Sequence, residues 1–146
     1  MLLPFLFTAC SALAGEEVGR IKVNEVSDPD HIVYKEITIA LKKNDEIGIW
    51  SDMDIAYEGD VAMRFQLGLW KDGKQMGVME IDPTENDMTL DVFKKSINGK
   101  TEWSFKGRNK NITIGEDGNY TFKAAFGASD NKTLKVNKAE IMLKKL

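Results

Sequence analysis

Cysteine and histidine are almost absent from this chain of 146 residues, which contains one of each, Cys10 and His31. A single cysteine excludes a disulfide within the chain, so we expect the fold to be stabilised by its hydrophobic core. A domain of about this length buries roughly two thirds of its unfolded surface and can be stable without a disulfide or structural metal. The 42% of hydrophobic residues are sufficient for such a core.

Catalytic motifs are also absent. His31 lies in an aspartate-rich, turn-like stretch, residues 27–31, where an exposed imidazole is the ordinary expectation. The sequence contains no zinc-protease helix motif, no nucleophile elbow and no glycine-rich phosphate loop. We therefore expect a protein that is not an enzyme. A hydrolase or lyase with an unrecognised pair of carboxylates among the 23 acidic residues is an alternative that stays open.

Positive and negative charges are nearly equal in number, since the chain has 20 basic and 23 acidic residues and a net charge of −3. This balance argues against the basic surface that binding to nucleic acid or to an anionic membrane requires. Beyond the N-terminus, no apolar stretch approaches the roughly 20 residues of a membrane-spanning helix. We therefore expect any attachment to a membrane to come only from a covalent lipid.

The one uncharged apolar run is at the N-terminus, residues 1–14, and it ends in small residues, as export signals do. Within it, Phe7-Thr8-Ala9-Cys10 resembles the lipobox of bacterial lipoproteins, although that family prefers leucine where this chain has Phe7. The resemblance implies cleavage before Cys10, lipidation of Cys10 and a place in the outer membrane or at the cell surface. Alternatively, Ala12-Leu13-Ala14 fits ordinary secretory cleavage before Gly15, which would give a periplasmic or secreted protein.

The rest of the chain alternates between apolar and polar residues. We expect a short polar tether at residues 15–19 and one domain at residues 20–146. The clearest strand is predicted at residues 61–70, with Val61, Met63, Phe65, Leu67 and Leu69 on the core face. Further strands are predicted at residues 20–26, 33–41, 46–50, 74–82, 101–105, 111–114, 119–128 and 133–145. Residues 88–97 fit a short helix about as well as a strand.

About nine short strands without long helices predict an all-β fold, an antiparallel sandwich of two sheets. The closing segment, residues 118–145, has a Gly-x-Tyr strand, a short turn and a long final strand. It resembles the last two strands of jelly-roll modules of the galactose-binding and carbohydrate-binding type. The resemblance implies a jelly-roll arrangement and points to a glycan as the ligand, although a fold alone does not fix a function.

Two Asp-Gly turns predict hairpin registers. A three-residue loop at residues 71–73 sets Phe65 opposite Met79 and Arg64 opposite Glu80. The same type of loop at residues 116–118, with Gly118 in the left-handed region, pairs the strands on either side of it. In the last strand the apolar positions change phase, which predicts a β-bulge near Asn137-Lys138.

Tryptophans are the candidate ligand contacts. Alternation places Trp70 on the outer face beside Arg64 and Gln66, where the neighbouring Gly68 would leave the indole ring open, and we expect this ring to be largely exposed. Such an open ring can stack on a sugar. Trp50 and Trp103, which end or interrupt short predicted strands, are further aromatic candidates, and so is Tyr57.

Acidic stretches are candidate calcium sites, since Ca²⁺ prefers hard oxygen ligands. One offers Asp82, Glu85 and Asp87; another lies at residues 52–60. Neither has EF-hand spacing, and solvated turns are the ordinary alternative. We expect no cofactor other than this candidate calcium ion.

Together these observations predict an exported, lipid-anchored β-sandwich that binds a glycan or another extracellular or envelope partner, and no nucleic acid. The alternative is a structural subunit of a cell-envelope assembly, which a contiguous apolar patch or an unpaired edge strand would favour.

Overall fold

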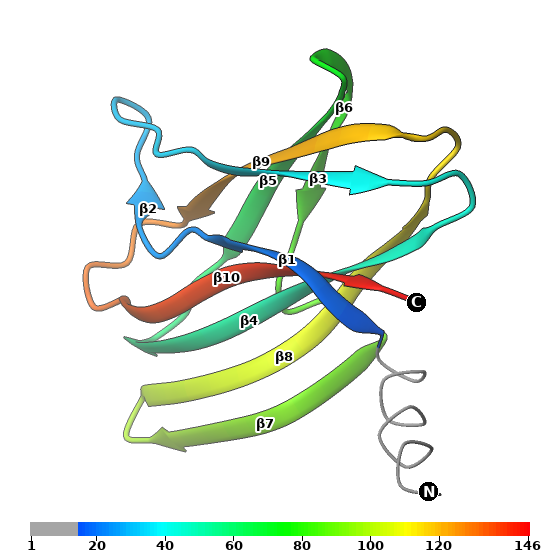
Figure 1. Cartoon of the computed structure of the whole chain (residues 1–146). Coiled ribbons are helices and arrows are strands. Elements are labelled where there is room, and N and C mark those ends of the chain that lie inside the picture. Colours follow the sequence, from blue (N-terminus) through cyan, green and yellow to red (C-terminus); the bar gives the residue numbers. More distant parts are fainter. Residues whose placement is uncertain (1–14) are drawn as a thin grey trace, which may run out of the picture.

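The computed structural model describes residues 15–146, which form an all-β protein of ten strands (Figure 1). The predicted export segment, with Cys10, lies outside the described residues. The strands are β1 (Glu16–Lys22), β2 (Val26–Ser27), β3 (Lys35–Leu41), β4 (Glu46–Glu58), β5 (Met63–Lys71), β6 (Lys74–Ile81), β7 (Met88–Ile97), β8 (Lys100–Thr113), β9 (Gly118–Ala128) and β10 (Lys135–Lys145). Residues 15–146 contain no helix with the length and hydropathy of a membrane span.

The strands form two sheets packed face to face, which confirms the predicted β-sandwich. Sheet A has the order β1-β10-β4-β8-β7, and sheet B has the order β2-β9-β5-β6 with β3 also paired to β9. In Figure 1, sheet B lies above sheet A. The strands β1, β10, β4 and β8 facing β3, β9, β5 and β6 form the eight-stranded jelly roll. The strand β7 is therefore an addition at the edge of sheet A.

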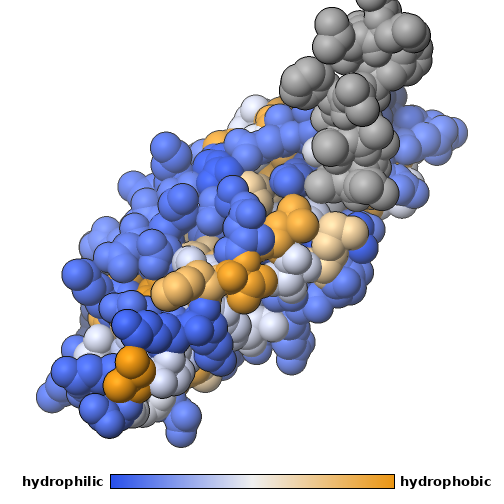
Figure 2. Space-filling model, turned by 90° about the horizontal axis from the view of Figure 1, so that it is seen from below, coloured by the Kyte–Doolittle hydropathy of each residue, from blue (hydrophilic) through white to orange (hydrophobic). Residues whose placement is uncertain are grey.

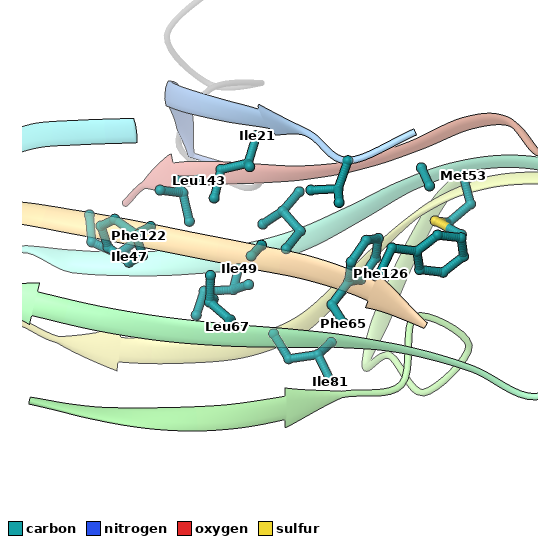
Figure 3. Packing of buried hydrophobic residues seen from close by; sticks show 14 of the residues in the cluster. Ile21, Ile47, Ile49, Met53, Phe65, Leu67, Ile81, Phe122, Phe126 and Leu143 are labelled. Atoms are coloured by element: carbon teal, nitrogen blue, oxygen red, sulfur yellow. The ribbon is translucent and has the colours of Figure 1, made fainter. Parts of the chain in front are cut away.

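The core lies between the sheets and is made of alternate residues from the strands other than β2 and β7 (Figure 3). In β5, Met63, Phe65 and Leu67 point inward and are buried, as the alternation predicts. Phe65 packs against Phe126 of β9 with ring centroids 5.1 Å apart. Met53 of β4 contributes from the opposite sheet. This core leaves the second face of each sheet to point outward.

Several strands are longer than the sequence predicts. β4 runs without interruption to Glu58, and one strand, β8, replaces the two short strands expected at residues 101–105 and 111–114. Residues 88–97, which were ambiguous, form the strand β7. The first strand starts at Glu16 and pairs with β10, so it includes most of the stretch predicted as a tether.

The predicted register of the β5–β6 hairpin is wrong. Phe65 lies opposite Ile81, not Met79, and Gln66 lies opposite Glu80. Asp72 and Gly73 form a two-residue turn in which both have positive φ, 48° and 84°, as a type I′ turn requires. A β-bulge between Leu69 and Trp70 supplies the change of phase that the longer loop was expected to supply.

The second predicted hairpin is also wrong, because β8 and β9 belong to different sheets and do not pair. Residues 114–117 carry the chain from sheet A to sheet B, and Gly118 begins β9 without a positive φ. The bulge predicted in the last strand is confirmed, since the pairing of β10 with β4 shifts between Val136 and Lys138.

Candidate functional site

The outer face of sheet B carries the best candidate site, around Trp70. Alternation along β5 turns Arg64, Gln66, Gly68 and Trp70 away from the core. Gly68 allows the indole to fold back over the strand: a Cβ atom at this position would lie 2.5 Å from Cζ3 of Trp70. The indole is therefore half-buried, not largely exposed as the sequence predicts.

A hollow of about 340 Å³ lies beside this indole, and Trp70, Tyr34 and Lys123 line it. The ammonium group of Lys123 lies 4.6 Å from the centre of the Tyr34 ring, which is 46% exposed. The remaining lining comes from Gln66, Gly68, Gln75 and Val78. Two aromatic rings and two side-chain amides therefore surround one open hollow.

A second hollow, of about 440 Å³, lies next to the first, because Gln66 lines both. Arg64 and Glu80 contribute to it from β5 and β6, and residues 27–32 form one of its walls. That wall is held by local hydrogen bonds: Asp28 Oδ1 accepts from the backbone N–H groups of Asp30 and His31. We call the lining of the two hollows together the Trp70 face.

The charges of the Trp70 face are nearly balanced. The Arg64 guanidinium lies 3.4 Å from the Glu80 carboxylate, and both side chains are more than half exposed. Lys123 adds a positive charge and Asp28 a negative one. A surface of this kind offers hydrogen-bond donors and acceptors without strong attraction for either sign of charge.

Of the predicted ligand contacts, Trp70, Arg64 and Gln66 come together on this face. The other aromatic candidates, Trp50, Tyr57 and Trp103, lie in sheet A and cannot share a surface with Trp70. Tyr57 and Trp103 pack against the core, and the Trp103 ring lies 4.7 Å from that of Phe105.

Trp50 is fully buried although it points to the outer face of sheet A. The ammonium group of Lys144 lies 4.5 Å from the centre of its ring. Among the described atoms, its indole N–H has no hydrogen-bond acceptor. Burial lowers the pKa of Lys144 from its ordinary value. Trp50 therefore contributes to packing and offers no open ring to a ligand.

Sequence reasoning missed Tyr34, Gln75 and Lys123. Lys123 lies directly opposite Gly68 across the β5–β9 pairing, and Gln75 lies opposite Trp70 across the β5–β6 pairing. These two residues can be placed beside Trp70 only when the strand pairs and the bulge at Leu69-Trp70 are known. Tyr34 precedes β3, and no alternation of apolar and polar residues identifies it as a ligand contact.

The candidate calcium ligands are engaged in other contacts. Asp82 Oδ1 accepts hydrogen bonds from the backbone N–H and the hydroxyl of Thr84, which is the solvated turn that sequence reasoning gave as the alternative. The Arg108 guanidinium donates to Asp87 at 2.8 Å and lowers the pKa of that carboxyl. Glu85 does not join them in a metal-binding cluster, and within residues 15–146 no three acidic, histidine or cysteine side chains form one.

Comparison with protein-family models and with curated proteins gives no match to this chain.

Proposed function

We propose that this chain is an exported, lipid-anchored, non-enzymatic binding module that recognises a glycan through the Trp70 face. The observation that carries the proposal is the pairing of an outward indole with a second aromatic ring, Tyr34, across a hollow edged by amide side chains. Export and the lipid anchor rest on the sequence of residues 1–14.

Sugars suit this combination of groups. The C–H faces of a pyranose ring pack on the face of an aromatic side chain, while its hydroxyl groups need both donors and acceptors. Gln66 and Gln75 supply both from their amides, and Tyr34 adds a phenolic hydroxyl. Because Arg64 is paired with Glu80, the face favours an uncharged oligosaccharide over a polyanionic one.

The two neighbouring hollows also favour a chain of sugars over a single sugar. The first hollow holds the aromatic rings, and the second extends past Gln66 to Arg64, Glu80 and residues 27–32. A ligand that follows β5 would contact Trp70 at one end and Arg64 at the other.

Affinity electrophoresis in gels that contain a β-glucan, a xylan, a mannan or a galactan tests this proposal. We expect one of these polysaccharides to retard the protein, and Trp70→Ala to lower the affinity about fivefold or more through loss of stacking. Gly68→Ala should have a similar effect without removing the ring, because the added Cβ occupies the place of the indole edge. The loss of stability from Trp70→Ala should stay at about 1–2 kcal/mol, since the ring is only half-buried.

Two control variants isolate the Trp70 face. Gly77→Ala adds a methyl group on β6 and Gly115→Ala adds one between β8 and β9, and no atom lies within 4 Å of either new carbon. Both should bind as the unmodified protein does. A protein that none of the polysaccharides retards, or a Trp70→Ala variant that binds normally, would contradict the proposal.

A further inference from the structure

The added strand β7 is an exposed edge with apolar side chains. Within residues 15–146 it pairs only with β8, so its outer edge presents unpaired backbone N–H and C=O groups. Val92, Phe93 and Ile97 are 57%, 55% and 54% exposed. Figure 2 views the molecule from below, the side on which β7 lies in Figure 1, and shows apolar groups interrupting the hydrophilic surface. Such an edge is suited to adding a strand from another chain.

The charges of β7 favour an antiparallel partner of the same sequence. Its N-terminal half carries one acidic residue, Asp91, and its C-terminal half carries two basic ones, Lys94 and Lys95. When two copies pair antiparallel, the acidic half of each strand faces the basic half of the other. A parallel pair would place like charges side by side.

The β-bulge in β7 determines which faces meet. Pairing with β8 shifts between Leu90 and Phe93, and Asp91 there has a φ of 53°. In β7, the residues on the outer face of sheet A therefore have even numbers before the bulge and odd numbers after it. By their pairing with β8, these outward residues are Met88, Leu90, Phe93, Lys95 and Ile97.

We propose that β7 pairs antiparallel with β7 of a second copy, with Phe93 on the two-fold axis. Positions are counted outward from Phe93 in both directions, and Asp91 and Val92 of the bulge count as one position. Lys95 of one copy then lies opposite Leu90 of the other, and Ile97 lies opposite Met88, all on the outer face. On the inner face, Ser96 meets Thr89. Apolar groups face apolar groups, the aliphatic stem of Lys95 lies along Leu90, and Lys94 lies opposite the bulge that holds the partner's acidic residue.

Without the bulge the same pairing would fail. In a regular strand centred on Phe93, Ile97 would lie opposite Thr89 and Ser96 opposite Leu90, so apolar side chains would face polar ones. A β-bulge ordinarily interrupts the pairing of an edge. Here the extra residue is what brings the two halves of the strand into phase.

This inference is independent of glycan binding. β7 supplies no residue to either hollow of the Trp70 face, so both copies in the pair keep that face open. A two-fold dimer would present two Trp70 faces, and two linked sites bind a repeating polymer more tightly than one does.

Cysteine cross-linking tests the register directly. In the full chain with Cys10→Ser, Phe93→Cys places a thiol on the proposed two-fold axis, and Leu90→Cys places one on the same face away from it. A disulfide needs Cβ atoms about 4 Å apart, which only position 93 provides. Under mild oxidation we expect Cys at position 93 to form dimers at least about tenfold faster than Cys at position 90.

A second measurement does not depend on a new cysteine. Sedimentation of the Cys10→Ser chain should show a monomer–dimer equilibrium over about a hundredfold range of concentration, and Phe93→Lys should abolish the dimer by placing like charges on the axis. Because Phe93 is exposed, Phe93→Lys should fold normally. A monomer at every concentration, association that survives Phe93→Lys, or equal cross-linking at positions 90 and 93 would overturn the proposal.

Discussion

Arg20 shows how single residues stabilise the outer face of sheet A. Its guanidinium donates hydrogen bonds to Glu17 at 2.7 Å, to Asp52 at 2.7 Å and to Glu140 at 2.8 Å. Asp52 and Glu140 are buried. The bond with Glu17, followed by those with Asp52 and Glu140, raises the pKa of Arg20, and Arg20 in turn lowers the pKa of Glu17. Asp52, a candidate calcium ligand by sequence, is therefore part of an ion-pair network.

Removing Arg20 should cost stability, because two buried carboxylates would lose their principal counter-charge. We expect Arg20→Met to lower the free energy of unfolding by about 3 kcal/mol at neutral pH, measured by urea denaturation. The loss should shrink in acid. Folding lowers the pKa of Glu17, so the stability that its ion pair with Arg20 contributes is complete above the ordinary glutamate pKa, about 4.3. This stability is lost as the pH falls through the lower pKa of the folded state.

Arg64→Met is the matched control, since Arg64 also pairs with a glutamate, Glu80, but at an exposed position. Its cost should be below about 1 kcal/mol. Equal costs for the two substitutions would contradict the structural role of the Arg20 network.

The tryptophans show what sequence can determine at the scale of single residues. Alternation along β5 correctly turns Trp70 outward. Trp50 also points to an outer face, yet it is buried because Lys144 from β10 lies over its ring. The period of a strand predicts the face of a side chain, but its exposure depends on neighbouring strands that are distant in sequence.

At the scale of strands, the two Asp-Gly pairs did not correctly predict how the neighbouring strands pair. The Asp-Gly pair at residues 72–73 does close a hairpin, but the bulge at Leu69-Trp70 changes the register. The Asp-Gly pair at residues 117–118 looks the same in sequence and joins two sheets instead. Local residues select the turn, while the pairing of long strands across the sandwich decides which strands it connects.

Two glycines in connecting segments, Gly73 and Gly115, should respond differently to substitution by valine. Gly73 has a φ of 84°, a region that a β-branched side chain resists, so Gly73→Val should destabilise the protein by about 1–2 kcal/mol. Gly115→Val is the control, because Gly115 has no positive φ and no atom within 4 Å of an added Cβ. Thermal unfolding should show a lower Tm for Gly73→Val alone; equal shifts would contradict the type I′ turn.

At the scale of the whole molecule, the sequence predicted the two-sheet sandwich because apolar alternation extends through nearly every strand. It could not identify β7 as an added edge strand, since residues 88–97 carry no strict period and lie almost entirely exposed. The Trp70 face was found only in part, because it is assembled from β5, β6, β9 and the residues before β3.

The proposed anchor concerns the whole chain and rests on Cys10. We expect mass spectrometry of the membrane fraction to find a diacyl or triacyl group on Cys10, and Cys10→Ser to release the protein, since two or three acyl chains give stable attachment. A soluble form that begins at Gly15 would contradict the lipid anchor and favour ordinary secretion.

The central claim is that a glycan binds at the Trp70 face, and the three tryptophans allow one measurement to test it. Trp50, Trp70 and Trp103 each give an indole N–H signal in a ¹⁵N correlation spectrum, which Trp→Phe variants assign. During titration with soluble oligosaccharides of the same four polysaccharides, the Trp70 signal should shift and saturate, while the buried Trp50 and the core-packed Trp103 stay in place. No shift at Trp70 with any oligosaccharide, or a saturable shift at Trp50 or Trp103 instead, would contradict the account.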